Sequence, residues 1–161
     1  MANGVIKIYY GEGRGKSSSA LGNAVLAAAE SKEAIIIQFL KEKISMQEEY
    51  LKRFEPELKL FRFAKQDECF EKLSEELQAE ERKNLRNGFN YGKKVISTSA
   101  CDLLVLDEIL GLIDEKIIEI DEIKEILTRK PEDMDIILTG RILPDEIRKM
   151  ANEVYHISQE Y

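Results

Sequence analysis

Short apolar runs that alternate with segments of helical spacing constrain the fold of this chain more than any other feature. The runs VIKIYY, AIIIQF, DLLVLDE and MDIILTGR occupy residues 5–10, 34–39, 102–108 and 134–141. Consecutive apolar positions, as in AIIIQF, are typical of strands that are covered on both faces and therefore parallel. Between the runs, apolar residues recur at helical spacing, as in residues 16–30 and 117–127. The alternation predicts an α/β fold with a mainly parallel sheet flanked by helices.

Three other segments complete the predicted architecture. Residues 58–63 (LKLFRF) alternate as a strand does, and residues 153–157 (EVYHI) predict a short last strand. Pro144 suits the first turn of a helix that runs to about residue 151. Because the 161 residues contain no visible linker or repeat, we expect a single nucleotide-binding α/β domain over residues 1–161.

The stretch from Asp67 to Ser97 is rich in charged residues and carries an apolar stripe at helical spacing. It predicts either one long helix or two, with Gly88 and Gly92 as a weak point. Its Glu-rich part, residues 71–82, is interpreted as a solvated helix face.

The formal net charge of −7 argues against nucleic acid as a partner, because a nucleic-acid binder needs a basic face. The cysteines Cys69 and Cys101 fit no metal-ligand spacing, and Cys101, just before an apolar run, is expected at the edge of the core. No secretory signal is visible, and no apolar run approaches the roughly 20 residues that cross a bilayer. We therefore expect a cytoplasmic protein without a membrane partner.

The stretch GEGRGKSS, residues 11–18, has the composition of a phosphate-binding loop between a strand and a helix. Three residues separate Gly11 from Gly15, whereas the usual G-x-x-x-x-G-K-[ST] motif has four. Glycines allow backbone N–H groups to face an anion, Lys16 and Arg14 add positive charge, and Ser17 or Ser18 offers Mg²⁺ a hydroxyl. The alternative is a glycine-rich turn that binds no ligand.

Two carboxylates end the apolar run LLVLDE, at Asp107 and Glu108. This resembles the Walker B strand, whose carboxylate holds Mg²⁺, although such residues also cap helices. Arg141, in LTGR, could reach phosphates or lie on the surface as an ordinary arginine. His156 is interpreted as a surface or edge residue. No Ser/His/Asp or Cys/His set is present, so the sequence does not support hydrolysis by a nucleophilic side chain.

Four stretches, taken together, resemble one known family. In chain order they are YYGEGRGKSSSALGNAVLAA, IIIQFLK, CDLLVLDEI and KPEDMDIILTGRILPDEI, and the likeness extends from about Ile6 to Ala151. They resemble the ATP:cob(I)alamin and cob(I)yrinic acid a,c-diamide (corrinoid) adenosyltransferases of the short P-loop type. The shortened loop is the most specific feature, because ordinary P-loop enzymes lack it. The resemblance implies a P-loop NTPase fold of RecA-like architecture.

The resemblance implies that Co(I) of a reduced corrinoid attacks the 5′ carbon of ATP and that triphosphate leaves, without a general base. Lys16, Glu108 and Arg141 would be the catalytic residues. Mg²⁺ would bind to Ser17, Asp107 and Glu108, and Gln38 and Lys41 would lie near the site. The triphosphate would be held by Gly11, Glu12, Gly13, Arg14, Gly15, Lys16, Ser17 and Ser18. The family implies a homodimer and a flavoprotein reductase as a partner.

The chain departs from the family pattern at several points. Glu12 replaces an Asn-like residue, which predicts weaker phosphate binding, and serines replace the threonines after Lys16. The chain has no tryptophan, so Phe61, Phe63 or Phe70 would have to take the place of the family's mid-chain aromatic segment at the corrinoid. The family's C-terminal tail motif is also missing.

Two other functions remain open. One is a P-loop enzyme that cleaves or transfers the γ-phosphate, with Glu108 activating water or a hydroxyl. The other is an ATP-binding paralogue without corrinoid activity, which Glu12 and the missing tail favour.

Overall fold

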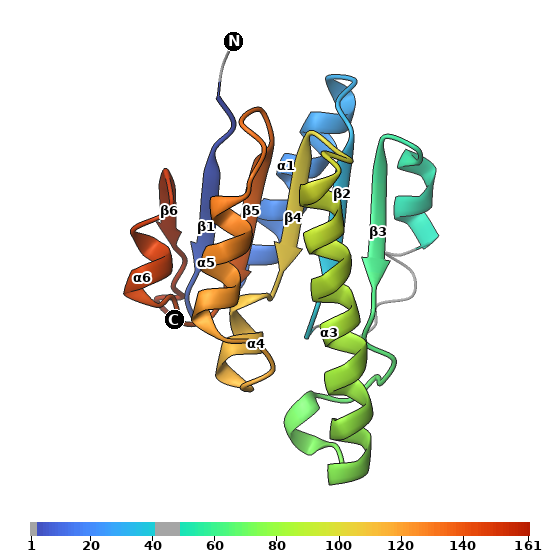
Figure 1. Ribbon diagram of the computed structural model, residues 1–161, viewed down its shortest axis with the longest axis vertical. Coiled ribbons are helices and arrows are strands. Elements are labelled where there is room, and N and C mark those ends of the chain that lie inside the picture. The colour runs from blue at the N-terminus through green and yellow to red at the C-terminus, as the bar shows by residue number, and fades with distance from the viewer. Residues whose placement is uncertain (1–2, 41–48) are drawn as a thin grey trace.

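One parallel sheet organises the described part of the chain. The computed structural model describes residues 3–40 and 49–161. All neighbouring strands of the sheet are parallel, in the order β3-β2-β4-β5-β1-β6 (Figure 1). The strands are β1 (Ile6–Tyr10), β2 (Ala34–Gln38), β3 (Leu58–Arg62), β4 (Leu103–Asp107), β5 (Asp135–Gly140) and β6 (Glu153–His156). The predicted α/β class is confirmed, and so are the two strands inferred from residues 58–63 and 153–157.

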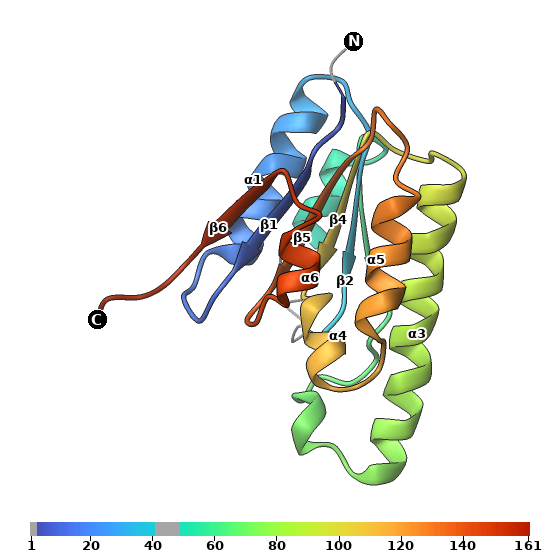
Figure 2. The same ribbon diagram turned by 60° about the vertical axis from the view of Figure 1, so that its left-hand side comes forward.

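Helices cover both faces of the sheet. Helix α1 (Lys16–Ala29) lies on one face, and α3 (Glu75–Ser97) and α5 (Ile120–Thr128) lie on the other (Figure 2). Each face has its own core of buried apolar side chains. Shorter elements are α4 (Leu110–Asp114), α6 (Asp145–Arg148), η1 (Lys52–Phe54) and η2 (Phe70–Lys72). Among the described residues, no helix combines the length and the apolar character needed to span a membrane.

Helix α3 is one continuous helix, so the alternative of two helices is wrong. It begins after Ser74, whose side chain accepts a hydrogen bond from the Leu77 amide. Gly88 and Gly92 are buried contact points rather than a weak point. A Cβ on Gly88 would lie 2.9 Å from the Phe63 ring, whereas one on Gly92 would meet Ile37 and Leu106 at an ordinary 3.5 Å. Gly88 therefore lets α3 closely approach Phe63, the residue that follows β3.

The charged segment before and within α3 is not wholly solvated. Glu81 is buried, and its carboxylate accepts hydrogen bonds from the Lys65 amide at 2.9 Å and from Asn84 Nδ2 at 2.8 Å. The expectation of a solvated face is therefore wrong at this residue. A buried carboxylate is tolerated when it is hydrogen-bonded in this way, and Glu81 thereby fixes the turn that follows β3.

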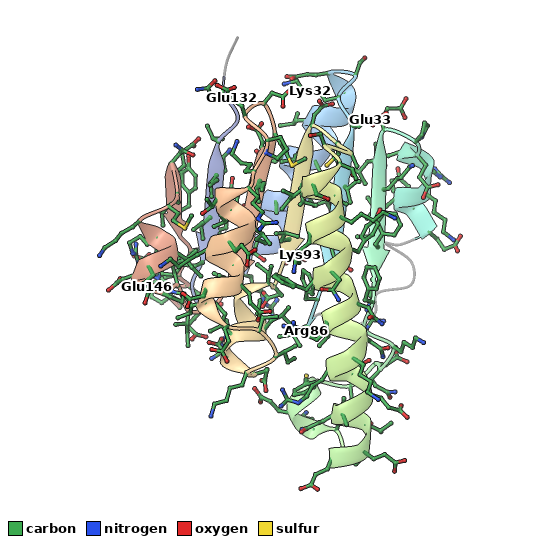
Figure 3. The ribbon with its side chains drawn as sticks, viewed as in Figure 1. Lys32, Glu33, Arg86, Lys93, Glu132 and Glu146 are labelled. Carbon is green, nitrogen blue, oxygen red and sulfur yellow. The ribbon has the colours of Figure 1, made fainter. Side chains whose placement is uncertain are left out.

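Two helices are shorter than their sequence patterns predicted. Helix α5 begins at Ile120 because Glu119 and Glu122 form a capping box there. Glu122 also binds Arg86 of α3 at 2.9 Å and thus ties the two helices together; Arg86 is labelled in Figure 3. Burial of Glu122 by itself would raise its pKa. Hydrogen bonds from the Glu119 backbone and from Arg86 outweigh burial, so the pKa of Glu122 is lowered. Helix α6 ends at Arg148, three residues before the predicted end.

Candidate functional site

Three strand ends meet at one edge of the sheet and carry most of the predicted site residues. Strand β5 lies between β1 and β4 in the sheet. Because parallel strands end at the same edge, the loop after β1, the carboxylates at the end of β4 and Arg141 after β5 come together. Gln38, at the end of β2, pairs with Asp107 in the strand register. Lys41 lies outside the described residues.

The loop after β1 turns sharply and delivers the chain into α1. Gly11 and Gly15 have φ angles of +128° and +112°, a region that favours glycine. Gly15 is the N-cap of α1, and no acidic side chain lies in the first turn. The N–H groups of a first turn have no partner within the helix, and the helix dipole makes this end positive. The end of α1 is therefore suited to bind an anion.

Two loop amides are already bonded within the protein. The Gly11 amide donates to the carbonyl oxygen of Gly140 at 3.1 Å, and the Gly13 amide donates to that of Ile157 at 3.1 Å. This differs from the expectation that the glycine amides all face a ligand. Gly11 and Gly13 instead shape the loop, and the first turn of α1 is the better candidate for an anion.

The cations at the site differ in their surroundings. Lys16 is half-buried, and its Nζ donates to the carbonyl oxygen of Gly13 at 2.7 Å, so its ammonium group lies over the loop. Arg14 is exposed. Arg141 forms a two-pronged ion pair with Glu12, from Nε to Oε2 at 3.1 Å and from a terminal nitrogen to Oε1 at 3.2 Å. The hydrogen bond to Glu12 and the charge of Glu12 raise the pKa of Arg141.

Asp107 is the polar centre of the site. It is only 3% exposed, and its Oδ1 accepts hydrogen bonds from Ser17 Oγ at 2.9 Å and from Thr139 Oγ1 at 2.7 Å. Thr139 is fully buried, and its hydroxyl in turn accepts the Glu108 amide at 2.7 Å. These bonds join the ends of β4 and β5 to α1. Sequence reasoning assigned no role to Thr139, although LTGR was singled out.

Glu108 is half-buried and adopts a left-handed backbone with φ +64°, which is uncommon for a residue other than glycine. The next helix, α4, has Ile109 as its N-cap and no side-chain cap. The interpretation of Asp107 and Glu108 as helix caps is therefore wrong for the described helix. Among the described residues, no group of three or more His, Cys, Asp or Glu side chains could hold a metal ion.

Sequence reasoning missed two carboxyl groups, those of Asp114 and Glu115, whose pKa is raised in the fold. Burial raises the pKa of Asp114, and the positive charge of Arg141 opposes this shift. Burial and a hydrogen bond with Glu71 raise the pKa of Glu115. No sequence signal distinguished these residues from ordinary charged residues on helix surfaces, because only the fold brings Asp114 near Arg141 and Glu115 near Glu71.

The aromatic residues considered for the corrinoid pack within the fold. The Phe61 and Phe63 rings contact the Tyr91 ring of α3 with centroids 4.9 and 5.8 Å apart. Phe70 is buried, with the Arg82 guanidinium 5.1 Å from its ring. His156 is exposed at the end of the edge strand β6, as expected, and stacks on Tyr10 at 4.8 Å.

The fold and site define a class. A parallel sheet with a glycine-rich loop after β1 and a buried acid at the end of β4 is the architecture of P-loop NTPases, in the RecA-like arrangement. A KaiC-like protein of Pyrococcus horikoshii OT3 has a similar fold, with a TM-score of 0.55 and 16% identity over 99% of this chain and 74% of that one. This likeness concerns the fold alone.

The chain belongs to the ATP:corrinoid adenosyltransferase family BtuR/CobO/CobP, whose family model matches residues 2–160. The corrinoid adenosyltransferase of Escherichia coli K12 is 24% identical over 151 residues, which cover 94% of this chain and 74% of that protein. Corrinoid adenosyltransferase CobA of Salmonella typhimurium LT2 is 25% identical with the same coverage. The chain is therefore an enzyme of the transferase class, and ATP and a corrinoid are the substrates that its family implies.

Proposed function

We propose that this enzyme transfers the 5′-deoxyadenosyl group of ATP to Co(I) of a reduced corrinoid and releases triphosphate. One observation carries the proposal. The shortened glycine loop brings Lys16 and the positive end of α1 beside Ser17, whose hydroxyl is bonded to the buried Asp107. This arrangement suits a polyphosphate accompanied by a divalent cation.

The triphosphate is held by the first turn of α1, from Gly15 to Ser18, and by the side chains of Lys16 and Arg14. Gly11 and Gly13 shape the loop, and their own amides are bonded to carbonyl oxygens. Arg141 reaches the phosphates once its ion pair with Glu12 is exchanged for them. Glu12 lies on the rim of the same loop, and its negative charge opposes the triphosphate.

The donor atoms at the site fit Mg²⁺. Ser17 Oγ and the carboxylates of Asp107 and Glu108 are hard oxygen ligands, and Mg²⁺ is usually bound by one or two carboxylates together with substrate phosphates. When bound, Mg²⁺ offsets the negative charge of the triphosphate.

The chemical step is a single displacement. The electron pair of Co(I) forms the cobalt–carbon bond to C5′ while the bond from C5′ to the triphosphate oxygen breaks, and triphosphate leaves with that bond's electrons. No proton is transferred, so the reaction needs no general base. The protein's task is to orient C5′ and to stabilise the charge of the leaving group. Lys16, Arg141 and the end of α1 supply that stabilisation.

We further propose that residues 1–161 form one nucleotide-binding domain that acts as a homodimer in the cytoplasm. A flavoprotein reductase would supply the electrons that reduce the corrinoid to Co(I). The family resemblance supports both the dimer and the reductase.

One assay tests the proposal. The enzyme is mixed with ATP, Mg²⁺ and chemically reduced cobalamin; the Co(I) spectrum is followed, and phosphate products are identified by phosphorus NMR. We expect Co(I) to be consumed with formation of an equal amount of triphosphate. With Lys16→Ala, we expect the Co(I) spectrum to persist and no triphosphate to form. ADP and orthophosphate would instead support a γ-phosphate enzyme. ATP binding without loss of Co(I) would support a paralogue that lacks corrinoid activity.

A further inference from the structure

The segment that follows β6 runs beside the phosphate loop. The Ile157 amide donates to the carbonyl oxygen of Tyr10 at 2.8 Å, and the Ile157 carbonyl accepts the Gly13 amide at 3.1 Å. The last register pair of the two strands is Tyr10 with His156, so these bonds continue the β1–β6 ladder past the sheet. We call residues 157–161 the tail; it is distinct from the family's C-terminal motif. Figure 2 shows β6 beside β1 and the tail continuing beyond the sheet edge.

The tail approaches the loop so closely that only glycine fits at two loop positions. A Cβ on Gly13 would lie 2.9 Å from the carbonyl carbon of Ser158 and 3.1 Å from that of Ile157. A Cβ on Gly11 would lie 2.1 Å from the Ile157 oxygen. Glycines in phosphate loops are usually explained by the ligand. Here the tail explains two of them.

Side chains anchor the same contact. The His156 ring stacks on Tyr10 at 4.8 Å, and the Arg148 guanidinium lies 5.0 Å from the Tyr10 ring. Arg148 also donates to the Tyr10 hydroxyl at 3.2 Å. Tyr10 is the last residue of β1. The start of the loop is therefore held both by contacts to the Tyr10 side chain and by the backbone bond from Ile157.

We infer that Ile157 and Ser158 position the phosphate loop for triphosphate binding. Their backbone fixes the path from Gly11 to Gly13, and this path determines where Gly15 and the first turn of α1 face the ligand. A loop that is already held in its binding conformation loses less conformational entropy when the ligand binds. The inference rests on the proposed function, because it takes this loop as the triphosphate site.

Two chain lengths test the inference. A chain that ends at His156 lacks the tail contact, whereas a control chain that ends at Gln159 keeps Ile157 and Ser158. We expect the shorter chain to bind ATP about tenfold more weakly, the size expected for losing one or two hydrogen bonds. Its KM for ATP should rise while its KM for the corrinoid and its unfolding midpoint change little. Equal ATP affinity in the two chains would overturn the inference.

A double-mutant cycle tests whether position 13 requires glycine because of the tail backbone or because of the bound phosphates. In the full chain, Gly13→Ala should weaken ATP binding about tenfold or more, because the new methyl group collides with the tail backbone. In the chain that ends at His156, the same substitution should have little further effect. An equal loss in both chains would show that the methyl group obstructs the phosphates directly, and would overturn the inference.

A full-length variant keeps the test valid if the short chain fails to fold. Ile157→Pro removes the amide that donates to Tyr10, whereas Ile157→Val keeps both backbone bonds. Weaker ATP binding in Ile157→Pro alone supports the inference, and equal binding in the two variants overturns it.

Lys16→Ala in the full chain distinguishes a failure of the inference from a failure of the proposed function. If Lys16→Ala abolishes ATP binding while the tail variants bind ATP normally, only the inference about the tail fails. If the Lys16→Ala variant binds ATP normally, the proposed triphosphate site and the inference both fail.

Discussion

At the scale of single residues, Ser17 is the side chain that links α1 to the buried acid of β4. Its hydroxyl donates to Asp107 Oδ1 at 2.9 Å, and we assign the same oxygen to Mg²⁺. Ser17→Ala should raise the Mg²⁺ concentration for half-maximal activity by about tenfold or more, whereas Ser17→Thr should keep it near that of the wild type. Titration of the initial rate with Mg²⁺ measures both variants. Superimposable curves for Ser17→Ala and the wild type would remove Ser17 from the metal site.

The ion pair of Glu12 and Arg141 gives a second prediction. Both side chains are mostly exposed, so the pair adds little to folding stability. Replacing the carboxylate in Glu12→Gln removes a negative charge beside the phosphates and frees Arg141 to bind them. ATP affinity, measured by calorimetry, should rise about two- to fivefold with no change in melting temperature.

A fall in ATP affinity in Glu12→Gln would contradict this prediction. Weaker ATP binding would mean that Glu12 holds Arg141 in the orientation that ATP needs, rather than competing with ATP for it. Arg141→Gln is the matched control, and it should weaken ATP binding whether or not Glu12 is present.

At the scale of elements, the packing of α3 on the sheet depends on one of its two central glycines. Gly88→Ala would press a methyl group against the Phe63 side chain and should destabilise the fold by about 1–3 kcal/mol. Gly92→Ala finds ordinary contact distances and improves helix propensity, so it should be neutral or stabilise the fold by up to about 1 kcal/mol. Chemical denaturation of the two variants measures both values. The same sign of change in both would contradict this account of α3.

The sequence identified the elements of the site better than their contacts. Asp107 and Arg141 were each predicted at the end of a strand, and the parallel sheet brings those strand ends to one edge. The role of Thr139 depends on the register of β4 and β5, in which Leu138 pairs with Leu106 and Thr139 follows beside Asp107. The contact between Gly13 and Ile157 depends on the edge strand β6 pairing with β1. Neither register nor long-range pairing can be read from local composition, so both required the structure.

At the scale of the whole molecule, the two cysteines report on folding. Cys101 is buried, and this burial raises the pKa of its thiol to about 12, whereas Cys69 is exposed. With a thiol reagent at about pH 8, one cysteine should react rapidly in the native protein and the second only after unfolding. Cys69→Ser is the control and should leave no rapidly reacting thiol. Two rapid thiols in the native wild type would contradict the described core.

The position of the bound nucleotide is tested most directly by a crystal structure with Mg²⁺ and a non-reactive ATP analogue. We predict that the triphosphate lies against the first turn of α1 and Lys16, that Mg²⁺ lies beside Ser17 and Asp107, and that the 5′ carbon faces solvent. Phosphates bound elsewhere, or a 5′ carbon buried against the protein, would contradict it.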